Sequence, residues 1–248
     1  MKLLVAICQT PDTTAKIDFT DGNTKFNTNG VQYILNPTDE WYALVRAIEL
    51  KEQLGGTVTV INVGLADADQ NIRKALAIGA DDAVRINADP AECDAYVVAG
   101  YIADFAQGKN FDLIFTGKET IDYNGYSVPS ILAELLDLPH VSLAMHLDIA
   151  DNAATIDREI EGGVEKVKVA LPCLVSAQKG MAEQRIPNMK GIMSARSKKL
   201  EVIQPKPITP LCRVQIFELP PQAKQTKMIA ADNPEELVRL LREEAKAI

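Results

Sequence analysis

The sequence predicts a doubly wound α/β fold with a mostly parallel sheet. Continuous apolar runs alternate with amphipathic segments through residues 2–138, and this alternation is typical of parallel strands joined by right-handed helical crossovers. The apolar runs contain few polar residues, which indicates strands covered on both faces. After Val141 the pattern changes, because Thr155–Ile160 and Val164–Ala170 flank the turn Glu161-Gly162-Gly163 and predict an antiparallel hairpin.

The first predicted strand is Lys2–Cys8, a continuous apolar run. Asp21-Gly22-Asn23 then predicts a turn, because β-prone residues lie on both sides of it within Lys16–Thr28. Further apolar runs predict strands at Thr57–Val63, Ala83–Ile86, Phe111–Thr116 and Pro172–Ala177.

The first helix is predicted to begin at Asn36-Pro37-Thr38-Asp39. Asn36 can cap the helix, Pro37 suits the first helical position, and Asp39 lies in the positive first turn. Gly55-Gly56 ends this helix. Other predicted helices run through Ile72–Ile78, from the cap Asp89 to about Gly108, and over Ser127–Leu138.

The end of the chain has a different composition. From Pro205 onward it is punctuated by prolines, and a terminal helix over Asn233–Ala247 carries Leu237, Val238 and Leu241 on one face. A segment so rich in proline does not form a core by itself. We therefore expect it to lie across another subunit.

Composition and charge exclude several classes of protein. With 248 residues, of which 47% are hydrophobic, the chain can form a full core. The net charge of −8 argues against a nucleic-acid-binding surface. The first apolar run is too short for a signal peptide, and no stretch approaches the length of a membrane span. Four scattered cysteines without a Cys-x-x-Cys pair predict neither disulfides nor a thiolate metal site, so a bacterial cytoplasmic location is expected.

The sequence contains no recognisable catalytic motif. It has neither a G-x-x-x-x-G-K-S/T loop nor a G-x-G-x-x-G turn after a strand, and no serine or cysteine lies in a nucleophile-elbow context. His140 and His146 are not spaced with carboxylates in a metal or triad pattern, so we expect ordinary strand or loop residues there. We therefore expect no catalytic residue, no metal site and no enzymatic activity of the chain itself.

Three segments fall where open α/β sheets bind ligands. They are the end of the first strand near Ala6, the helix start Asn36–Asp39, and the loop Gly117–Pro129. Glycines in the loop let backbone N–H groups approach a phosphate, and the helix that follows adds a positive dipole. An ordinary strand-to-helix loop explains the same residues, and the residues alone favour that interpretation.

The segment Gln184–Ile203 contains a loop, Arg185-Ile186-Pro187-Asn188-Met189, that runs into a short amphipathic helix. Met189, Ile192 and Met193 have a spacing that more often belongs to a protein core. Proline and polar neighbours favour exposure instead, and methionine suits a surface that meets several partners. The residues leave a core and a partner-binding surface equally open.

Several segments together resemble the beta subunit of an electron-transfer flavoprotein over nearly the whole chain. The most specific match is Asp157–Ser176, which combines an acid-glycine-glycine turn with a strand ending in proline and an apolar strand. The helix start at Asn36 is similar to the family's Asn-Pro-x-x-Glu pattern. Other matching segments are LLVAIC, LNPTDEWYALVRAIELKE, NIRKALAIGADDAVRI, FDLIFTGKETID and QRIPNMKGIMSARSKKLEVI.

The resemblance implies a fold akin to the adenine nucleotide alpha hydrolases in residues 1–204, and in residues 205–248 an arm and helix that pack on an alpha subunit. The heterodimer would hold one FAD, mostly in the alpha subunit, and a structural AMP in this chain. It would carry electrons from acyl-CoA dehydrogenases of fatty acid β-oxidation to a quinone oxidoreductase of the respiratory chain. One alternative is an electron-bifurcating subunit, with NADH and a second FAD in place of AMP. Another is a nucleotide-binding module without a redox partner.

Carried over by position, the resemblance also assigns site residues. The chain departs from the family at Val128-Pro129-Ser130, where AMP-binding members usually have Thr-Gly-Gln and bifurcating members have Ala-Gln-Val-Gly-Pro around the same place. AMP is expected because nothing in the sequence supplies a second flavin site. The implied AMP contacts are Ala6, Asn36, Pro37, Thr38, Asp39, Val63, Asp122, Tyr123, Asn124, Gly125, Tyr126, Ser127, Val128 and Pro129. The implied partner contacts are Arg185, Ile186, Pro187, Asn188, Met189, Lys190, Ile192 and Met193, with Met189 as the apolar anchor.

Overall fold

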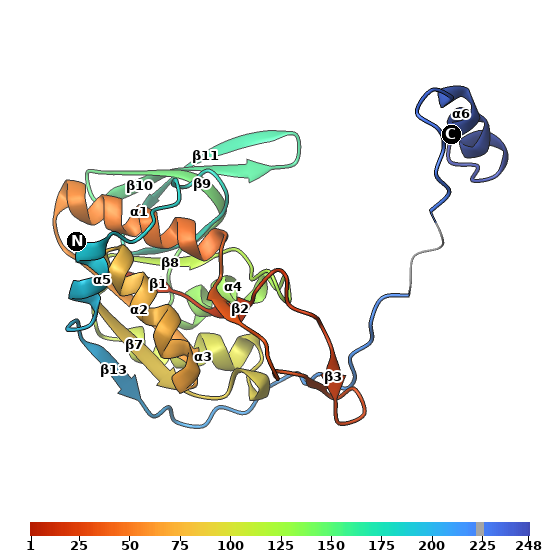
Figure 1. Ribbon diagram of the computed structural model, residues 1–248. Coiled ribbons are helices and arrows are strands. Elements are labelled where there is room, and N and C mark those ends of the chain that lie inside the picture. The colour runs from red at the N-terminus through yellow and green to blue at the C-terminus, as the bar shows by residue number, and fades with distance from the viewer. Residues whose placement is uncertain (222–225) are drawn as a thin grey trace.

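The computed structural model describes residues 1–221 and 226–248. In this part of the chain a nine-stranded, mostly parallel sheet forms the centre, with helices on both faces (Figure 1). The order of the strands across the sheet is β11-β10-β9-β12-β8-β1-β6-β7-β13. The predicted doubly wound α/β class is confirmed.

The parallel part of the sheet consists mostly of short buried strands that arise from the predicted apolar runs. Their bounds are β1 Lys2–Ala6, β6 Thr57–Gly64, β7 Asp82–Asn87, β8 Leu113–Gly117 and β12 Cys173–Ala177, with β9 His140–Ala150 and β13 Leu200–Ile203 at the two ends. The hairpin of β10 (Ala153–Ile160) and β11 (Gly163–Ala170) extends the sheet antiparallel to β9. The hairpin predicted from the Gly-Gly turn is therefore confirmed.

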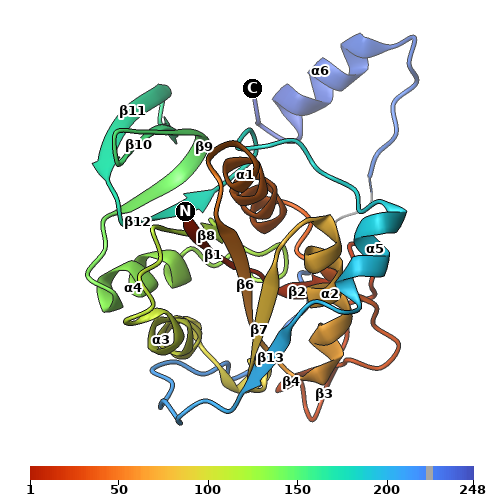
Figure 2. The ribbon, with the colours of Figure 1, turned by 90° about the vertical axis from the view of Figure 1, so that its left-hand side faces the viewer.

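Helices cover both faces of the sheet (Figure 2). One face carries α1 (Asp39–Leu54), α2 (Asp69–Ile78) and α5 (Met189–Ala195), and the other carries α3 (Ala95–Ala106) and α4 (Ser127–Leu135); a 3₁₀ turn, η1 (Ala66–Ala68), precedes α2. Because side chains alternate along a strand, Leu3 and Val5 of β1 belong to the core of the first face, whereas Leu4 and Ala6 belong to the core of the second. Among the described residues, no helix has both the length and the apolar character needed to cross a membrane.

Two small antiparallel pairs lie between β1 and α1. β2 (Gln9–Pro11) pairs with β5 (Tyr33–Leu35), and β3 (Phe19–Thr20) pairs with β4 (Lys25–Phe26). The predicted turn between β3 and β4 is confirmed, and Gly22 occupies the left-handed region there with a φ of 67°. After these two pairs, the chain returns to the edge of the sheet just before α1.

Two predicted helix starts are wrong. The first helix begins at Asp39, with Thr38 as its N-cap residue, because the amide of the buried Asn36 binds the loop after β8 and cannot cap α1. Asp89 caps only a 3₁₀ turn, η2 (Pro90–Glu92), and Asp94 caps α3. At Asn36 a tertiary contact replaced the local cap, whereas Asp89 makes the local cap that its pattern suggests but caps only this short turn.

The sequence pattern does not indicate β9 or β13 as strands. β9 lies partly in the core and partly in the exposed hairpin extension, so its side chains are neither uniformly apolar nor strictly alternating. β13 is an edge strand that pairs only with β7, and its two central residues are exposed. Neither pattern of burial leaves a clear periodic signal.

The segment of residues 204–221, called the arm below, forms neither helix nor strand but is attached to the domain. The carboxylate of Asp94 accepts hydrogen bonds from the N–H groups of Leu211 (2.7 Å) and Cys212 (2.9 Å). Phe217 stacks on Phe19 of β3, with ring centroids 5.0 Å apart. These contacts hold the arm at isolated points along an extended path.

The predicted terminal helix is confirmed as α6 (Pro234–Glu243), which Asn233 caps. Figure 1 shows α6 apart from the sheet. Within residues 226–248, the side-chain hydrogen bonds and ion pairs that the structure describes all join members of that same segment. Leu237 and Val238 are 47% and 42% exposed, so the apolar face of α6 is largely uncovered.

Candidate functional site

The carboxyl ends of β1, β6 and β8 lie side by side, because these strands are neighbours and run parallel. Ala6 ends β1, and Val63 is the residue before the end of β6. Asn36 brings a third segment to this edge, since its Nδ2 donates to the carbonyl of Glu119 (3.1 Å) and its Oδ1 accepts from the N–H of Ile121 (3.4 Å). The structure therefore brings together the segments in which nucleotide contacts are predicted.

The loop after β8 is exposed from Asp122 to Ser127. Tyr126 is the N-cap residue of α4 and makes no side-chain cap hydrogen bond, so the first N–H groups of the helix have no side-chain acceptor. Pro129 is buried in this turn and contributes no N–H. A Cβ at Gly125 would meet no atom within 4 Å, so the loop is open at that residue. This uncapped helix start suits an anion such as a phosphate.

Glu40 is a buried carboxyl group at the same edge of the sheet. Its Oε2 accepts a hydrogen bond from the N–H of Cys8 at 2.6 Å. Burial raises the pKa of Glu40 to about 8, and it raises the pKa of Asp39 to about 6 although Lys118 opposes that shift. A Cβ at Gly117 would lie 2.8 Å from the Cγ of Glu40, so only glycine fits against the start of α1. At neutral pH Glu40 keeps its proton, and the edge carries less negative charge than its acids suggest.

Asn62 of β6 presents an unpaired acceptor beside this edge. Its Nδ2 donates to the carbonyl of Ile7 at 2.9 Å, whereas its buried Oδ1 has no hydrogen-bond partner. A Cβ at Gly64 would lie 2.7 Å from this Oδ1, so the oxygen lies beside the last residue of the strand. An unpaired buried acceptor costs free energy, which a bound N–H donor would relieve. The oxygen is enclosed by the protein, and the uncapped start of α4 lies at the same edge of the sheet.

A cavity of about 620 Å³ lies beside this edge, next to the β10–β11 hairpin. It includes Asp39, one of the predicted nucleotide contacts, but it includes none of residues 122–129. The cavity and the loop after β8 are therefore separate parts of the same edge. Its lining residues are Asp39, Lys118, Met145, Glu159, Gly163, Val164, Gln178, Lys179 and Gly180.

The segment of residues 184–199, in which partner contacts are predicted and which is called the docking segment below for that prediction, exposes large apolar side chains. Ile186 is 83% exposed, Met189 is 73% exposed and Met193 is 68% exposed, while Ile192 is partly covered. Of the two interpretations that the spacing leaves open, a core is therefore wrong for these side chains. They form a surface at the start of α5.

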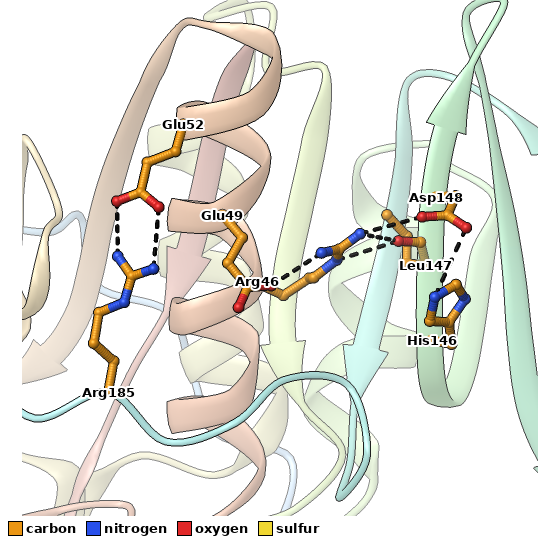
Figure 3. Close-up of polar contacts among 7 residues, drawn as sticks. All are labelled: Arg46, Glu49, Glu52, His146, Leu147, Asp148 and Arg185. Carbon is orange, nitrogen blue, oxygen red and sulfur yellow. Dashed lines mark hydrogen bonds and ion pairs between the residues drawn. The ribbon is translucent and has the colours of Figure 1, made fainter.

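Arg185 and Asn188, two of the predicted partner contacts, are engaged inside the chain. Arg185 forms a two-pronged ion pair with Glu52 in the last turn of α1, with N···O distances of 2.7 and 3.0 Å (Figure 3). Asn188 caps α5, because its Oδ1 accepts the N–H of Gly191 at 2.8 Å. Lys190 is exposed. Arg185 and Asn188 therefore hold the loop and the helix in place.

On the other side of α1, Arg46 ties this helix to β9. The buried guanidinium donates to the carbonyl of Leu147 and pairs with Glu49 (2.9 Å) and Asp148 (3.4 Å) (Figure 3). His146 lies on β9 with its Nε2 3.7 Å from Asp148, which agrees with the expectation of an ordinary strand residue. α1 therefore connects the docking segment with the part of the sheet that contains the hairpin.

Glu40 and Asn62 are not among the predicted contacts, and Gly117 is predicted only as the first residue of the ligand loop Gly117–Pro129. The sequence held a signal for Glu40, because it is the last residue of the Asn-Pro-x-x-Glu match. Asn62 is a polar residue inside an otherwise apolar run, and a buried polar side chain of this kind needs a partner. The need for glycine at residue 117 depends on the crossing of α1, so no local pattern reveals it.

The chain is therefore a doubly wound α/β protein. The carboxyl ends of its parallel strands form an edge of the kind at which such folds bind ligands, and a separate apolar segment is exposed. Residues 23–208 match the family described as "Electron transfer flavoprotein domain". The chain is 39% identical to the electron transfer flavoprotein subunit beta of Bacillus subtilis over 100% of both chains, and 32% identical to that of Homo sapiens over 98% of this chain and 97% of the relative. It is 34% identical to protein FixA of Azotobacter vinelandii over 82% of this chain and 74% of the relative. The chain belongs to the electron transfer flavoprotein family.

Beta subunits of this family are electron carriers and not enzymes. Among residues 1–221 and 226–248, no group of three His, Cys, Asp or Glu side chains is placed to hold a metal ion. The cysteines at 8, 93, 173 and 212 are free thiols.

Proposed function

We propose that this chain is the beta subunit of a heterodimer that accepts electrons from acyl-CoA dehydrogenases and delivers them to a quinone oxidoreductase of the respiratory chain. The alpha subunit holds most of the FAD, and the pair works in the bacterial cytoplasm. The observation that carries the proposal is the exposed apolar surface of Ile186, Met189 and Met193, in a segment that the Arg185–Glu52 pair and the Asn188 cap attach and order. A carrier of electrons needs such a surface, because it meets its donor and its acceptor in turn.

AMP at the carboxyl edge of the sheet is the second part of the proposal. The unpaired Oδ1 of Asn62 suits the amino group of adenine, and the N–H groups of Ser127 and Val128 suit the phosphate. The protonated state of Glu40 limits repulsion between the edge and the phosphate. The nucleotide would have a structural role in this chain. The residues that would hold it are Ala6, Asn36 to Asp39, Val63 and Asp122 to Pro129.

Co-expression with an alpha subunit tests both parts. The heterodimer is purified, its nucleotides are released by heat, and they are identified by mass and counted against protein. We expect equal amounts of FAD and AMP, and we expect no tightly bound flavin when this chain is purified alone. FAD at two per heterodimer with no AMP would support the electron-bifurcating alternative. Failure to form any stoichiometric complex would support a nucleotide-binding module without a redox partner.

Gly125→Val tests the place of the phosphate. The added side chain meets no protein atom within 4 Å of its Cβ, so the melting temperature of the nucleotide-free chain stays unchanged. It would obstruct the approach of a phosphate to the backbone, so the AMP content falls. Glu134→Val, an exposed change in α4, is the control and keeps its AMP. Wild-type AMP content in Gly125→Val would show that the loop does not bind the phosphate.

A further inference from the structure

The helix that presents Met189 is short, because α5 comprises 7 residues, Met189–Ala195. Isolated helices of this length are unstable in water, since nucleation costs more free energy than a few hydrogen bonds return. Residues 189–195 are nevertheless helical on the domain. The stability of this helix must therefore come from contacts outside it.

Arg73 of α2 satisfies the carboxyl end of α5. Its Nη1 donates to the carbonyl of Ala195 at 2.8 Å and to the carbonyl of Lys198 at 2.6 Å. The last carbonyls of a helix have no partner within the helix and carry partial negative charge. A guanidinium at this place supplies both the hydrogen bonds and a favourable charge.

Lys198 satisfies the carboxyl end of α2 in return. Its Nζ donates to the carbonyl of Leu76 at 2.9 Å and to that of Ala80, on either side of the end of α2 at Ile78. The cation that caps each helix thus comes from the other segment. We call this arrangement reciprocal capping.

Gly191 brings the two helices into direct backbone contact. A Cβ at this residue would lie 2.3 Å from the carbonyl oxygen of Ala77, so only glycine allows the approach. One turn further on, Ala195 is buried in the same core as Ala77. The inner side of α5 is therefore packed on the last turn of α2, while Met189 and Met193 remain exposed.

We propose that reciprocal capping positions Met189 for docking, and that Arg73 and Lys198 are positioning residues for partner recognition although both are engaged inside the chain. This inference rests on the proposed docking function of the segment. A surface that already has its bound geometry loses less conformational entropy on association, so it binds more tightly than a mobile one. The pair of Arg185 and Glu52 acts in the same direction on the preceding loop, but it is more exposed and contributes less.

The test compares Arg73→Met with Arg73→Lys in the intact heterodimer. Medium-chain acyl-CoA dehydrogenase and its acyl-CoA substrate reduce the flavin, and the rates give kcat and the KM of the dehydrogenase for the heterodimer. In Arg73→Met the docking-competent population falls to roughly a tenth, so this KM rises about tenfold while kcat changes little. Hydrogen exchange at the amides of residues 191–196 becomes faster. Arg73→Lys keeps a cation that can reach the same carbonyls, so it restores most of the KM.

Lys74→Met is the matched control on the same helix. Its Nζ lies 4.8 Å from the ring centroid of Trp41 and has no hydrogen bond or ion pair to the docking segment within the described residues. This variant leaves the KM and the exchange of α5 unchanged. Gly191→Ala disturbs the packing of α5 on α2 without a change in charge, so it raises the KM as Arg73→Met does.

Two results would overturn the positioning role. One is faster exchange in α5 with an unchanged KM, and the other is a raised KM with unchanged exchange. Met189→Ala separates this failure from a failure of the docking function. If Met189→Ala raises the KM and neither Arg73→Met nor Gly191→Ala does, only the positioning role is lost. If Met189→Ala also leaves the KM unchanged, the docking function itself fails.

Discussion

The docking segment and the arm both expose apolar side chains, but they are attached to the domain in different ways. α5 is held to α2 by cations on backbone carbonyls, by a glycine contact and by a buried alanine. The arm is extended and is held at isolated points, such as the carboxylate of Asp94 and the ring of Phe19. α6 shows no hydrogen bond or ion pair to residues 1–221 within the described chain.

This difference indicates two kinds of partner. A surface that contacts within the chain hold in place has the same shape before and after binding, so it suits partners that bind transiently. An extended segment with an uncovered helix loses conformational entropy when it is ordered, so it suits a partner that covers it during assembly and then stays. We therefore propose that the docking segment meets redox partners and that the arm with α6 binds the alpha subunit.

The largest expected effect comes from the apolar face of α6. Leu237→Asp with Val238→Asp places charges where the alpha subunit would cover them, and a buried unpaired charge costs roughly 3–5 kcal/mol. Heterodimer formation, measured by sedimentation, is lost, while the melting temperature of the chain alone stays the same. Lys246→Asp adds a carboxylate after the helix and serves as the control. Normal heterodimer assembly of the double variant would contradict the proposed contact between α6 and the alpha subunit.

A matched pair of glycines sharpens the comparison. A Cβ at Gly191 meets the backbone oxygen of Ala77 at 2.3 Å, whereas a Cβ at Gly100 meets the flexible end of Ile208 at 2.6 Å. Backbone cannot move aside as a side chain can, so Gly191→Ala costs roughly 1–3 kcal/mol and Gly100→Ala costs little. Chemical denaturation measures both values. Equal costs would mean that the arm is held as firmly as the docking segment.

Met189→Ala separates a surface role from a core role. The side chain is largely exposed, so its removal leaves the melting temperature nearly unchanged, but binding of the dehydrogenase weakens by roughly 1–3 kcal/mol. Leu44→Ala is the core control, because Leu44 is fully buried and its truncation costs roughly 2–5 kcal/mol of stability. Melting and dehydrogenase-dependent flavin reduction are measured on one sample. A large fall in melting temperature with normal partner kinetics would contradict the docking role.

The smallest expected effect is a dependence of the arm on pH. Burial acts to raise the pKa of Asp94, but hydrogen bonds from backbone N–H groups, including those of Val97, Cys212 and Leu211, outweigh it and hold the pKa below its usual range. A carboxylate with a lowered pKa stabilises the folded state above its unfolded pKa and loses this effect as the pH falls through the folded value. The amides of Leu211 and Cys212 therefore lose protection below about pH 4.

The docking segment provides the internal comparison for this acid effect. Reciprocal capping uses guanidinium and ammonium donors on carbonyls and no carboxylate, whereas the preceding loop depends on the Arg185–Glu52 pair, so the amides of residues 191–196 are the ones compared. Hydrogen exchange, corrected for the intrinsic effect of pH, measures the protection of the amides in both segments in one experiment. Asp94→Asn removes the acid step from the arm. An acid step that persists in Asp94→Asn would assign it to another group.

The alternation of strands and helices was open to prediction from the sequence because it depends on local periodicity. Continuous apolar runs such as Lys2–Cys8 lie in the sheet as expected, and the turns at Gly22 and Gly162-Gly163 formed where glycine is needed. Local preference failed at Asn36, because a tertiary contact to the loop after β8 removed it from the cap. It also failed for the edge strand β13, whose pairing depends on a distant strand.

The sequence by itself determined the fold class and the family, since these depend on order, spacing and residue type along the chain. Only the tertiary structure decided that Met189 is exposed, that Glu40 is buried and protonated, and that Arg73 and Lys198 cap each other's helices. Exposure, pKa and capping depend on which distant groups come within a few ångströms, because desolvation and hydrogen bonding act over that range. No pattern of neighbours along the chain contains those distances.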